Sequence, residues 1–279
     1  MKLTEHAHAK VNLVLRVAPP RADGLHPLCS IFASLQLADI VTVERAREDS
    51  VVCAGVDGPN LAAAAVSAFR AAVPALQPLA VGIEKRIPVA AGMGGGSADA
   101  AAVLRAANRL SGAGLGAGEL RRIAAELGSD VPSQVEPRHA LVSGVGELVS
   151  PLALPPLALV LLSPDEGLPT ASVFAELDRL RARTDAPPVP ALDPERLRRL
   201  VRAPVAQLAT ALENDLERAT ISLRPELVGE LERLRGAGAL GARITGSGPT
   251  AFGLFADRES AETAAAALPG AIVTEARAC

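Results

Sequence analysis

The sequence of 279 residues contains no tryptophan and no tyrosine, and it has only five phenylalanines. Aromatic residues make up 2% of the chain while hydrophobic residues of all kinds make up 49%, so the core must be packed with alanine, leucine and valine. Lysine is scarce too, because the 28 basic residues include only Lys2, Lys10 and Lys85. A reaction that needs an ammonium group therefore has few candidates.

Paired cysteines, excess charge and long apolar runs are also lacking. Cys29, Cys53 and Cys279 are odd in number and lie far apart, which predicts reduced thiols and no metal-ligand set. The net charge of −3 gives no basic footprint for nucleic acid or an anionic membrane. The longest apolar stretch, residues 152–162, falls short of the ~20 residues of a membrane helix, and the N-terminal segment lacks the apolar region of a signal peptide. We therefore expect a cytoplasmic protein with neither a nucleic-acid nor a membrane partner.

The length of the chain predicts two domains, since ~100 to 200 residues are usual for one. Prolines at positions 151, 155 and 156 mark a boundary, which gives domains over residues 1–150 and 151–279. The basic run at residues 195–202 is expected to be a solvated helix face.

Residues 7–17 alternate between apolar side chains and a second set that includes His8, Lys10 and Asn12. This period of two predicts a strand whose polar side chains lie together on one exposed face. A second alternating run leads through a glycine-rich loop into an alanine-rich helix. These two elements cover residues 79–84 and 98–110; further helices are predicted at residues 60–73, 118–127, 170–183, 194–201, 225–236 and 259–268, and further strands at 40–44, 157–162 and 250–255.

The loop at residues 88–97 is the strongest functional signal. Its four glycines, Gly92, Gly94, Gly95 and Gly96, let the backbone approach a ligand closely and point N–H groups at it. Because a helix begins directly after the loop, the segment predicts an anion site; a plain flexible turn is the alternative. The loop is neither a Walker A loop, which needs a closing Gly-Lys-Ser/Thr, nor a dinucleotide fingerprint, because Ser97 stands at the third glycine position.

Three polar residues could take part in chemistry, but each has an ordinary alternative. Lys10 could be a solvated lysine, Asp130 could start a turn or helix before Val-Pro, and His26 could be a loop histidine. A second glycine-rich stretch, residues 245–249, predicts only a tight loop by itself.

Taken together and in order, these stretches resemble the GHMP small-molecule kinases over almost the whole chain. The ordered set at these separations is specific, although each stretch alone is weak. The stretches lie at residues 9–13, 21–26, 88–97, 128–132, 214–217 and 245–248.

The resemblance implies an α+β fold with an N-terminal ribosomal-S5-like domain, a C-terminal ferredoxin-like domain and an active site in the cleft between them. It implies that Lys10 and Asp130 are the catalytic pair, with Asp130 taking or orienting the hydroxyl proton and Lys10 stabilising charge near the nucleophile. It also implies that the glycine-rich loop holds the phosphates of ATP and that Ser97 contacts the accompanying Mg²⁺. The implied ATP-binding residues are Pro88, Val89, Ala90, Ala91, Gly92, Met93, Gly94, Gly95, Gly96, Ser97 and Ala98.

Within the family, the chain is most similar to the branch that phosphorylates a hydroxyl of a cytidyl diphosphate alcohol in non-mevalonate isoprenoid synthesis, acting as a monomer or weak homodimer. Leu25 departs from that branch, which usually has an aromatic residue there, and Ala90 and Ala91 stand where relatives often carry glycine. The substrate-binding residues that the resemblance implies are Asn12, Leu25, His26, Leu28, Phe32, Thr170, Phe174, Gly246 and Ser247.

Two other functions are weighed against this one. A different GHMP kinase, acting on homoserine, a mevalonate derivative or a sugar, is favoured by Leu25 but not by the segment at residues 23–26. A nucleotide-binding module without catalysis would be expected to lack Lys10 or Asp130, and both are present.

Overall fold

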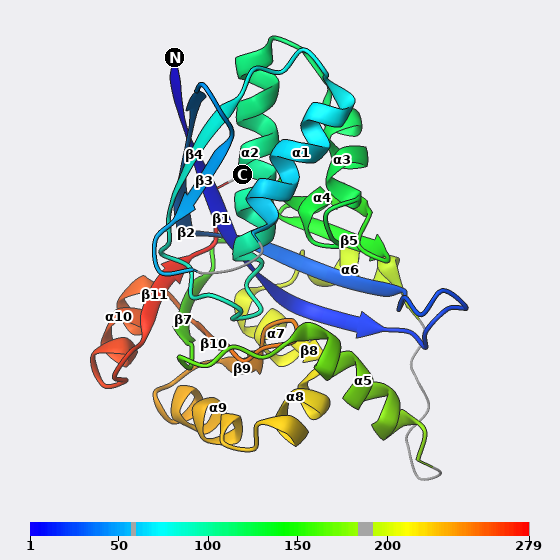
Figure 1. The fold of residues 1–279 in the computed structure, drawn as a ribbon. Coiled ribbons are helices and arrows are strands. Elements are labelled where there is room, and N and C mark those ends of the chain that lie inside the picture. Colours follow the sequence, from blue (N-terminus) through cyan, green and yellow to red (C-terminus); the bar gives the residue numbers. More distant parts are fainter. Residues whose placement is uncertain (57–59, 184–191, 279) are drawn as a thin grey trace. The chain divides into compact units, whose positions relative to one another are not determined.

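The computed structural model describes residues 1–56, 60–183 and 192–278. Two long strands, β1 (Lys2–Val17) and β2 (Leu28–Arg45), open the fold and are neighbours in one sheet (Figure 1). The chain divides into two compact units, and each of these strands contributes one half to each unit. The first unit is Met1–Ala9, Leu37–Val89 and Gly94–Arg138, and the second is Lys10–Gln36, Ala90–Met93 and His139–Cys279.

The first unit combines part of the sheet with helices. Here β4 (Leu79–Glu84) pairs antiparallel with β2 and parallel with β3 (Ser50–Cys53). Its core is rich in alanine and valine, with Phe69 the one aromatic side chain of its buried cluster. Small side chains let α1 and α2 lie close alongside each other (Figure 1). The helices of this unit are α1 (Leu61–Ala72), α2 (Gly95–Ser111), α3 (Ala117–Ala125) and α4 (Val131–Gln134).

The second unit contains a four-stranded antiparallel sheet in the order β11-β7-β10-β9. Every residue of β7 and β10 is buried, as expected for central strands of continuous apolar sequence. Leucines of α9 and alanines of α10 form one core cluster with this sheet. These elements are β7 (Ala158–Leu162), α9 (Leu227–Gly236), β9 (Gly241–Ile244), β10 (Ala251–Phe255), α10 (Arg258–Ala266) and β11 (Ile272–Glu275).

The other elements of the second unit pair with, or pack on, the parts of β1 and β2 that belong to this unit. There β1 pairs parallel with β8, and β2 pairs antiparallel with β5, which pairs with β6. Side chains of α5 and α8 pack on Leu15 and Val17 of β1. The elements are β5 (Ala140–Gly144), β6 (Leu148–Pro151), α5 (Thr170–Arg181), α6 (Pro194–Leu200), α7 (Val205–Thr210), β8 (Glu213–Asn214) and α8 (Glu217–Leu223).

The predicted α+β class is confirmed. Each predicted helix and strand is also present, with ends that differ by a few residues, but the strand predicted at 40–44 is only the end of β2.

One expectation is wrong: the polar side chains of β1 do not share an exposed face. Lys10 is 4% exposed and Asn12 is 2% exposed, because the loop at residues 245–248 covers them. The domain boundary expected near residue 150 stays a prediction.

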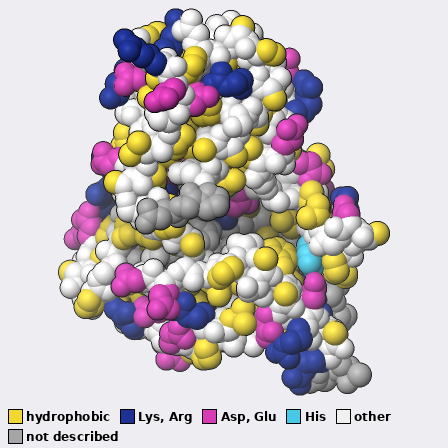
Figure 2. All heavy atoms as spheres, viewed as in Figure 1, with side chains coloured by type: hydrophobic (Ala, Val, Ile, Leu, Met, Phe, Trp, Pro, Cys, Tyr) yellow, Lys and Arg dark blue, Asp and Glu magenta, His cyan; other side chains and the backbone are white. Residues whose placement is uncertain are grey.

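The molecular surface carries no large patch of one charge on the face shown in Figure 2, where basic and acidic side chains lie side by side. This agrees with a net charge of only −3. No helix in the described part of the chain is both long and apolar enough to cross a bilayer.

Candidate active site

Lys10 lies in β1 at the point where the strand enters the second unit. Its Nζ donates a hydrogen bond to Asn12 Oδ1 at 2.7 Å and lies 4.8 Å from the centre of the Phe32 ring. A cation over an aromatic face is stabilised by the negative charge density of the ring. The structure thus brings together Lys10, Asn12 and Phe32, three of the residues singled out from the sequence, and it fixes the direction of the ammonium.

Asn12 links Lys10 to two further residues through hydrogen bonds. Its Nδ2 donates to Ser30 Oγ at 2.9 Å, and its backbone N–H donates to Thr245 Oγ1 at 3.0 Å. The side chain is therefore engaged by the protein itself, and we infer that it orients Lys10. Thr245 and Ser30 are residues that sequence reasoning missed, since a hydroxyl in a strand or glycine-rich loop has no distinguishing pattern.

The part of the glycine-rich loop that belongs to the second unit, Ala90–Met93, lies against Lys10 and the loop after β9. The backbone N–H of Lys10 donates to Met93 O at 3.0 Å. Gly92 has φ +76°, and a Cβ there would lie 2.5 Å from Thr245 O, which is backbone and cannot move aside. Gly92 therefore has both a conformational and a steric reason to be glycine.

Ala90 has φ +53°, the one positive value at a non-glycine residue in the described chain. An L-residue in this region costs about 1–2 kcal/mol, so glycine would take this backbone conformation at a lower cost than alanine does.

The part of the loop in the first unit forms the beginning of α2. Gly94, with φ +70°, is the N-cap, and no side chain caps the helix. Since the first intrahelical bond is donated by the Ala98 N–H to Gly94 O, the N–H groups of Gly95, Gly96 and Ser97 precede it. Orphan N–H groups and the positive end of the helix dipole favour an anion at this position. The predicted anion site therefore has the local geometry that it requires.

Asp130 is also in the first unit, at the N-cap position of α4. Its carboxylate makes no capping hydrogen bond to that helix, whereas its backbone carbonyl accepts a hydrogen bond from Ser133 Oγ at 2.7 Å. The side chain is half-buried. The ordinary role of an aspartate before Val-Pro, a side-chain cap, is therefore not the role it has here.

His26, Leu28 and Phe174 come together in the second unit. The rings of His26 and Phe174 have their centroids 4.9 Å apart, and Leu28 and Phe174 pack on the same core cluster. His26 Nε2 lies 2.9 Å from Asp178 Oδ1, a residue that the sequence did not suggest. The contact engages Nε2 and leaves Nδ1 as the second ring nitrogen that can take part in a hydrogen bond. Leu25, which precedes His26 in the chain, is 49% exposed.

Thr170, Gly246 and Ser247 also lie in the second unit. Thr170 Oγ1 and Ser247 Oγ are 3.0 Å apart. A Cβ at Gly246, which has φ +57°, would lie 3.4 Å from Lys10 Nζ. The loop at residues 245–248 therefore connects Lys10 with the start of α5, which ties five of the predicted binding and catalytic residues into one region: Lys10, Asn12, Thr170, Gly246 and Ser247.

A buried charge cluster next to the glycine-rich loop is a feature that sequence reasoning missed. Lys85 Nζ donates to Asp39 Oδ2 at 2.5 Å and to Asp99 Oδ2 at 2.9 Å. Burial raises the pKa of Asp99 to about 6, although the nearby charge of Lys85 acts in the opposite direction. Burial alone would lower the pKa of Lys85, but Asp39 and Asp99 have the larger effect together, so the pKa of Lys85 is raised. The scarcity of lysine was the one available signal, since Lys85 is one of three.

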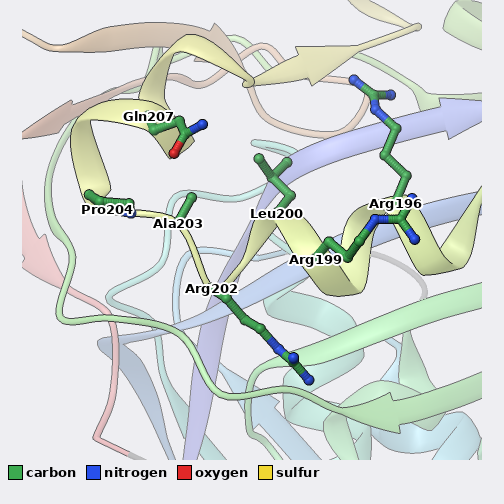
Figure 3. Close-up of a pocket in the computed structure, with 7 residues that line it drawn as sticks. All are labelled: Arg196, Arg199, Leu200, Arg202, Ala203, Pro204 and Gln207. Carbon is green, nitrogen blue, oxygen red and sulfur yellow. The ribbon is translucent and has the colours of Figure 1, made fainter.

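A hollow of about 490 Å³ opens beside α6 and α7, and none of the residues predicted for the site line it (Figure 3). Arg196 is engaged by Glu213 Oε1 at 3.0 Å, and the side chains of Arg196 and Arg202 extend in different directions. The arginines are exposed, so the predicted solvated helix face is confirmed and the guanidinium groups do not converge on a ligand. The lining residues are Arg196, Arg199, Leu200, Arg202, Ala203, Pro204 and Gln207.

No group of three or more histidine, cysteine, aspartate or glutamate side chains within residues 1–56, 60–183 and 192–278 could hold a metal ion. The hydroxyl of Ser97, half-buried in the first turn of α2, is an oxygen ligand of the kind Mg²⁺ accepts when phosphates supply the rest. These residues fit a metal that arrives with a nucleotide better than one held by the protein alone.

Comparisons with known proteins place these features in a family. GHMP kinases N terminal domain matches residues 60–136, and GHMP kinases C terminal matches residues 190–273. A 4-diphosphocytidyl-2-C-methyl-D-erythritol kinase of Anaeromyxobacter sp. (strain K) is 43% identical over 280 residues, which cover 97% of this chain and 86% of the relative. The chain belongs to the GHMP kinase family.

Two solved structures agree with that assignment. A 4-(cytidine 5'-diphospho)-2C-methyl-D-erythritol kinase superposes with a TM-score of 0.80 at 36% identity, covering 99% of this chain and 100% of the other. A homoserine kinase from Cytophaga hutchinsonii superposes with a TM-score of 0.66 at 16% identity, covering 99% and 94%, and it shows the shared fold alone. The two-domain GHMP fold expected from the sequence is thereby confirmed, and with it an ATP-dependent kinase of small molecules.

Proposed function

We propose that this kinase transfers the γ-phosphoryl group of ATP to the 2-hydroxyl of 4-diphosphocytidyl-2-C-methyl-D-erythritol, a step of isoprenoid precursor synthesis. The observation that carries the proposal is the 43% identity, over 97% of the chain, to a kinase named for that substrate. The bond between the γ-phosphorus and the bridging oxygen breaks, a bond to the hydroxyl oxygen forms, ADP leaves, and the hydroxyl proton must be accepted.

Lys10 and Asp130 carry out that chemistry in this proposal. Asp130 accepts the hydroxyl proton, and its half-buried carboxylate at the start of α4 is the kind of group that takes a proton in such a transfer. Lys10 stabilises negative charge at the attacking oxygen, and its fixed contacts with Asn12 and Phe32 support a role that needs a pre-oriented ammonium.

The phosphates of ATP are bound by the glycine-rich loop and the start of α2. The N–H groups of Gly95, Gly96 and Ser97 and the helix dipole favour the charge of the phosphates. When bound with ATP, Mg²⁺ neutralises charge on the phosphates, and Ser97 is the side chain that would contact it.

The cytosine base is read by His26 beside Phe174. The contact with Asp178 engages His26 Nε2, which leaves Nδ1 as the ring nitrogen for a hydrogen bond with the edge of the base. Phe174 offers a ring for stacking, and Leu28 adds apolar surface.

The experiment that tests the function is ADP release from the purified chain with ATP, Mg²⁺ and a panel of alcohols. We expect release with the cytidyl substrate and none above background with homoserine, mevalonate or a sugar. Preference for one of those alcohols would identify a different GHMP kinase, and no release with any of them would indicate a binding module. A cytoplasmic location and a monomeric or weakly dimeric state stay predictions.

Replacing Leu25 by tyrosine is expected to lower the KM for the cytidyl substrate several-fold and to leave the KM for ATP unchanged. A second ring restores base stacking, which is worth roughly 1–3 kcal/mol per base, and Leu25 is exposed enough to accept the larger side chain. Leu148→Tyr, at another exposed leucine, is the control and should change neither KM. Abolished substrate binding in Leu25→Tyr would show that the residue does not border a cytosine site.

A further inference from the structure

The buried cluster of Lys85, Asp39 and Asp99 connects three elements of the first unit at the base of the glycine-rich loop. Asp39 comes from β2, Lys85 follows β4 directly, and Asp99 is the fifth residue of α2. The Asp39 residue is 0% exposed, and the side chains of Asp99 and Lys85 are 4% and 14% exposed. Charges are rarely buried this far unless they are paired, so the cluster is a built feature of the fold.

Each member of the cluster has a defined position. Asp39 Oδ1 accepts the backbone N–H groups of Arg86 and Ile87 at 2.6 and 2.8 Å, which fixes this carboxylate against the chain that carries Lys85. Its other oxygen and Asp99 Oδ2 both accept from Lys85 Nζ. The ammonium is thus occupied by two carboxylates, which leaves it poorly suited to act as a direct charge partner for phosphate.

Lys85 also touches the start of α2. A Cβ at Gly95 would lie 3.2 Å from Lys85 Nζ and 3.2 Å from Ile87 Cγ2, so the first residue of the helix rests directly on the lysine head group. Gly95 and Asp99 are four residues apart and face the same side of α2. The lysine therefore contacts the helix twice, once at its first residue and once a turn later.

We propose that Lys85, clamped between Asp39 and Asp99, is a positioning residue for the phosphate site, which holds the first turn of α2 so that the N–H groups of Gly95, Gly96 and Ser97 stay directed at the nucleotide. The helix start has no side-chain cap, so a contact from outside the helix is what keeps the donors in place. This inference rests on the proposed function in taking ATP as the phosphate donor.

Asp99 provides the first test. Asp99→Ala removes the ion pair between Lys85 and α2, and we expect it to raise the KM for ATP and the Kd for a non-hydrolysable ATP analogue about tenfold or more. The kcat at saturating ATP and the KM for the alcohol should stay within about threefold of the wild type. Asp99→Asn keeps an oxygen that accepts from Lys85 and should restore most of the nucleotide affinity.

Lys85→Arg provides a second test. Unlike Asp99→Ala, it removes no buried side-chain volume, so the fold does not have to tolerate a new cavity. The charge is retained, so both carboxylates stay compensated and the fold is expected to survive. The larger guanidinium has no room beside Gly95 without displacing the first turn of α2, so the KM for ATP should again rise about tenfold.

Glu5→Ala is the matched control. Glu5 is a largely buried carboxylate of the same unit that pairs with Arg105 at 2.9 Å, on β1 and not at the loop. It should lower the Tm and leave nucleotide affinity unchanged.

The proposal is overturned if Lys85→Arg retains wild-type nucleotide affinity, if Asp99→Asn loses as much affinity as Asp99→Ala, or if Glu5→Ala raises the ATP KM as much as Asp99→Ala does. Calorimetric binding of the ATP analogue needs no alcohol substrate. A wild-type chain that binds the analogue but does not turn over the cytidyl substrate would therefore reject the proposed function alone and leave the clamp to be judged by the variants.

Discussion

Replacing Lys10 by alanine is expected to lower kcat by two or more orders of magnitude, about 3 kcal/mol of transition-state stabilisation, while ATP binding is largely kept. Lys10 is 4% exposed, and its contacts with Asn12 and Phe32 fix the direction of its ammonium group. Alanine removes this buried, oriented charge, and solvent cannot supply another one at the same position. Steady-state kinetics with calorimetric ATP binding measure the two effects separately.

Lys2→Ala is the natural control, because Lys2 lies on the same strand but is exposed. It should retain wild-type kcat. Near-normal turnover in Lys10→Ala would remove Lys10 from the chemistry and with it the proposed mechanism.

The partner substitution, Asp130→Ala, is expected to reduce kcat to the same extent without a matching loss of stability. Asp130 occupies an N-cap position without making a capping bond, whereas Asp257 caps α10 by accepting the Ser260 N–H at 2.8 Å. Asp257→Ala should therefore lower the Tm and leave kcat unchanged, the opposite pattern. Thermal unfolding and kinetics on both variants separate a catalytic carboxylate from a structural one.

Replacing Gly92 by alanine is expected to reduce kcat/KM for ATP by at least about 30-fold, equivalent to about 2 kcal/mol. The substitution adds a Cβ at φ +76° that would lie 2.5 Å from Thr245 O and 2.8 Å from Gly248 O. Because those atoms are backbone, the loop itself must move, and Met93 O, which accepts the Lys10 N–H, moves with it.

Gly112→Ala is a control that distinguishes the cost of a positive φ from the cost of a steric clash. Gly112 ends α2 with φ +72°, but a Cβ there meets nothing within 4 Å. This control should lose about 1–2 kcal/mol of stability from the left-handed conformation and keep wild-type use of ATP. If both variants lose ATP use equally, the close packing of Gly92 on the loop at residues 245–248 is not what the nucleotide site requires.

Much of the fold could be predicted because local patterns in this chain agree with the final structure. The alanine-rich segments became α1, α2 and α10, since alanine favours helices and its small side chain packs at close range. The strands β7 and β10 were found as apolar runs. The short strands β3, β5, β6, β8, β9 and β11 were not predicted, because their pairing partners lie elsewhere in the chain and two to five residues carry little periodicity. The short helices α4, α7 and α8 were missed as well, since four to seven residues show too few turns of a helical pattern.

Candidate site residues could be named from the sequence, but their contacts could not be predicted. The glycine-rich loop was recognised because its composition is dictated by backbone geometry, as Gly92 and Gly94 demonstrate with φ +76° and +70°. Asp178 beside His26 was missed because the two residues are 152 positions apart and neither has a distinctive neighbourhood.

The sequence by itself determined the class of the protein, the position of the glycine-rich loop and the small set of lysines and carboxylates that are candidates for chemistry, because those features are set by composition and by local backbone requirements. Only the tertiary structure decided that Lys10 is buried and directed by Asn12, and that Lys85 is clamped between Asp39 and Asp99. Burial and charge pairing depend on residues brought together from distant segments, and a side chain's periodicity on its own strand says nothing about what covers it.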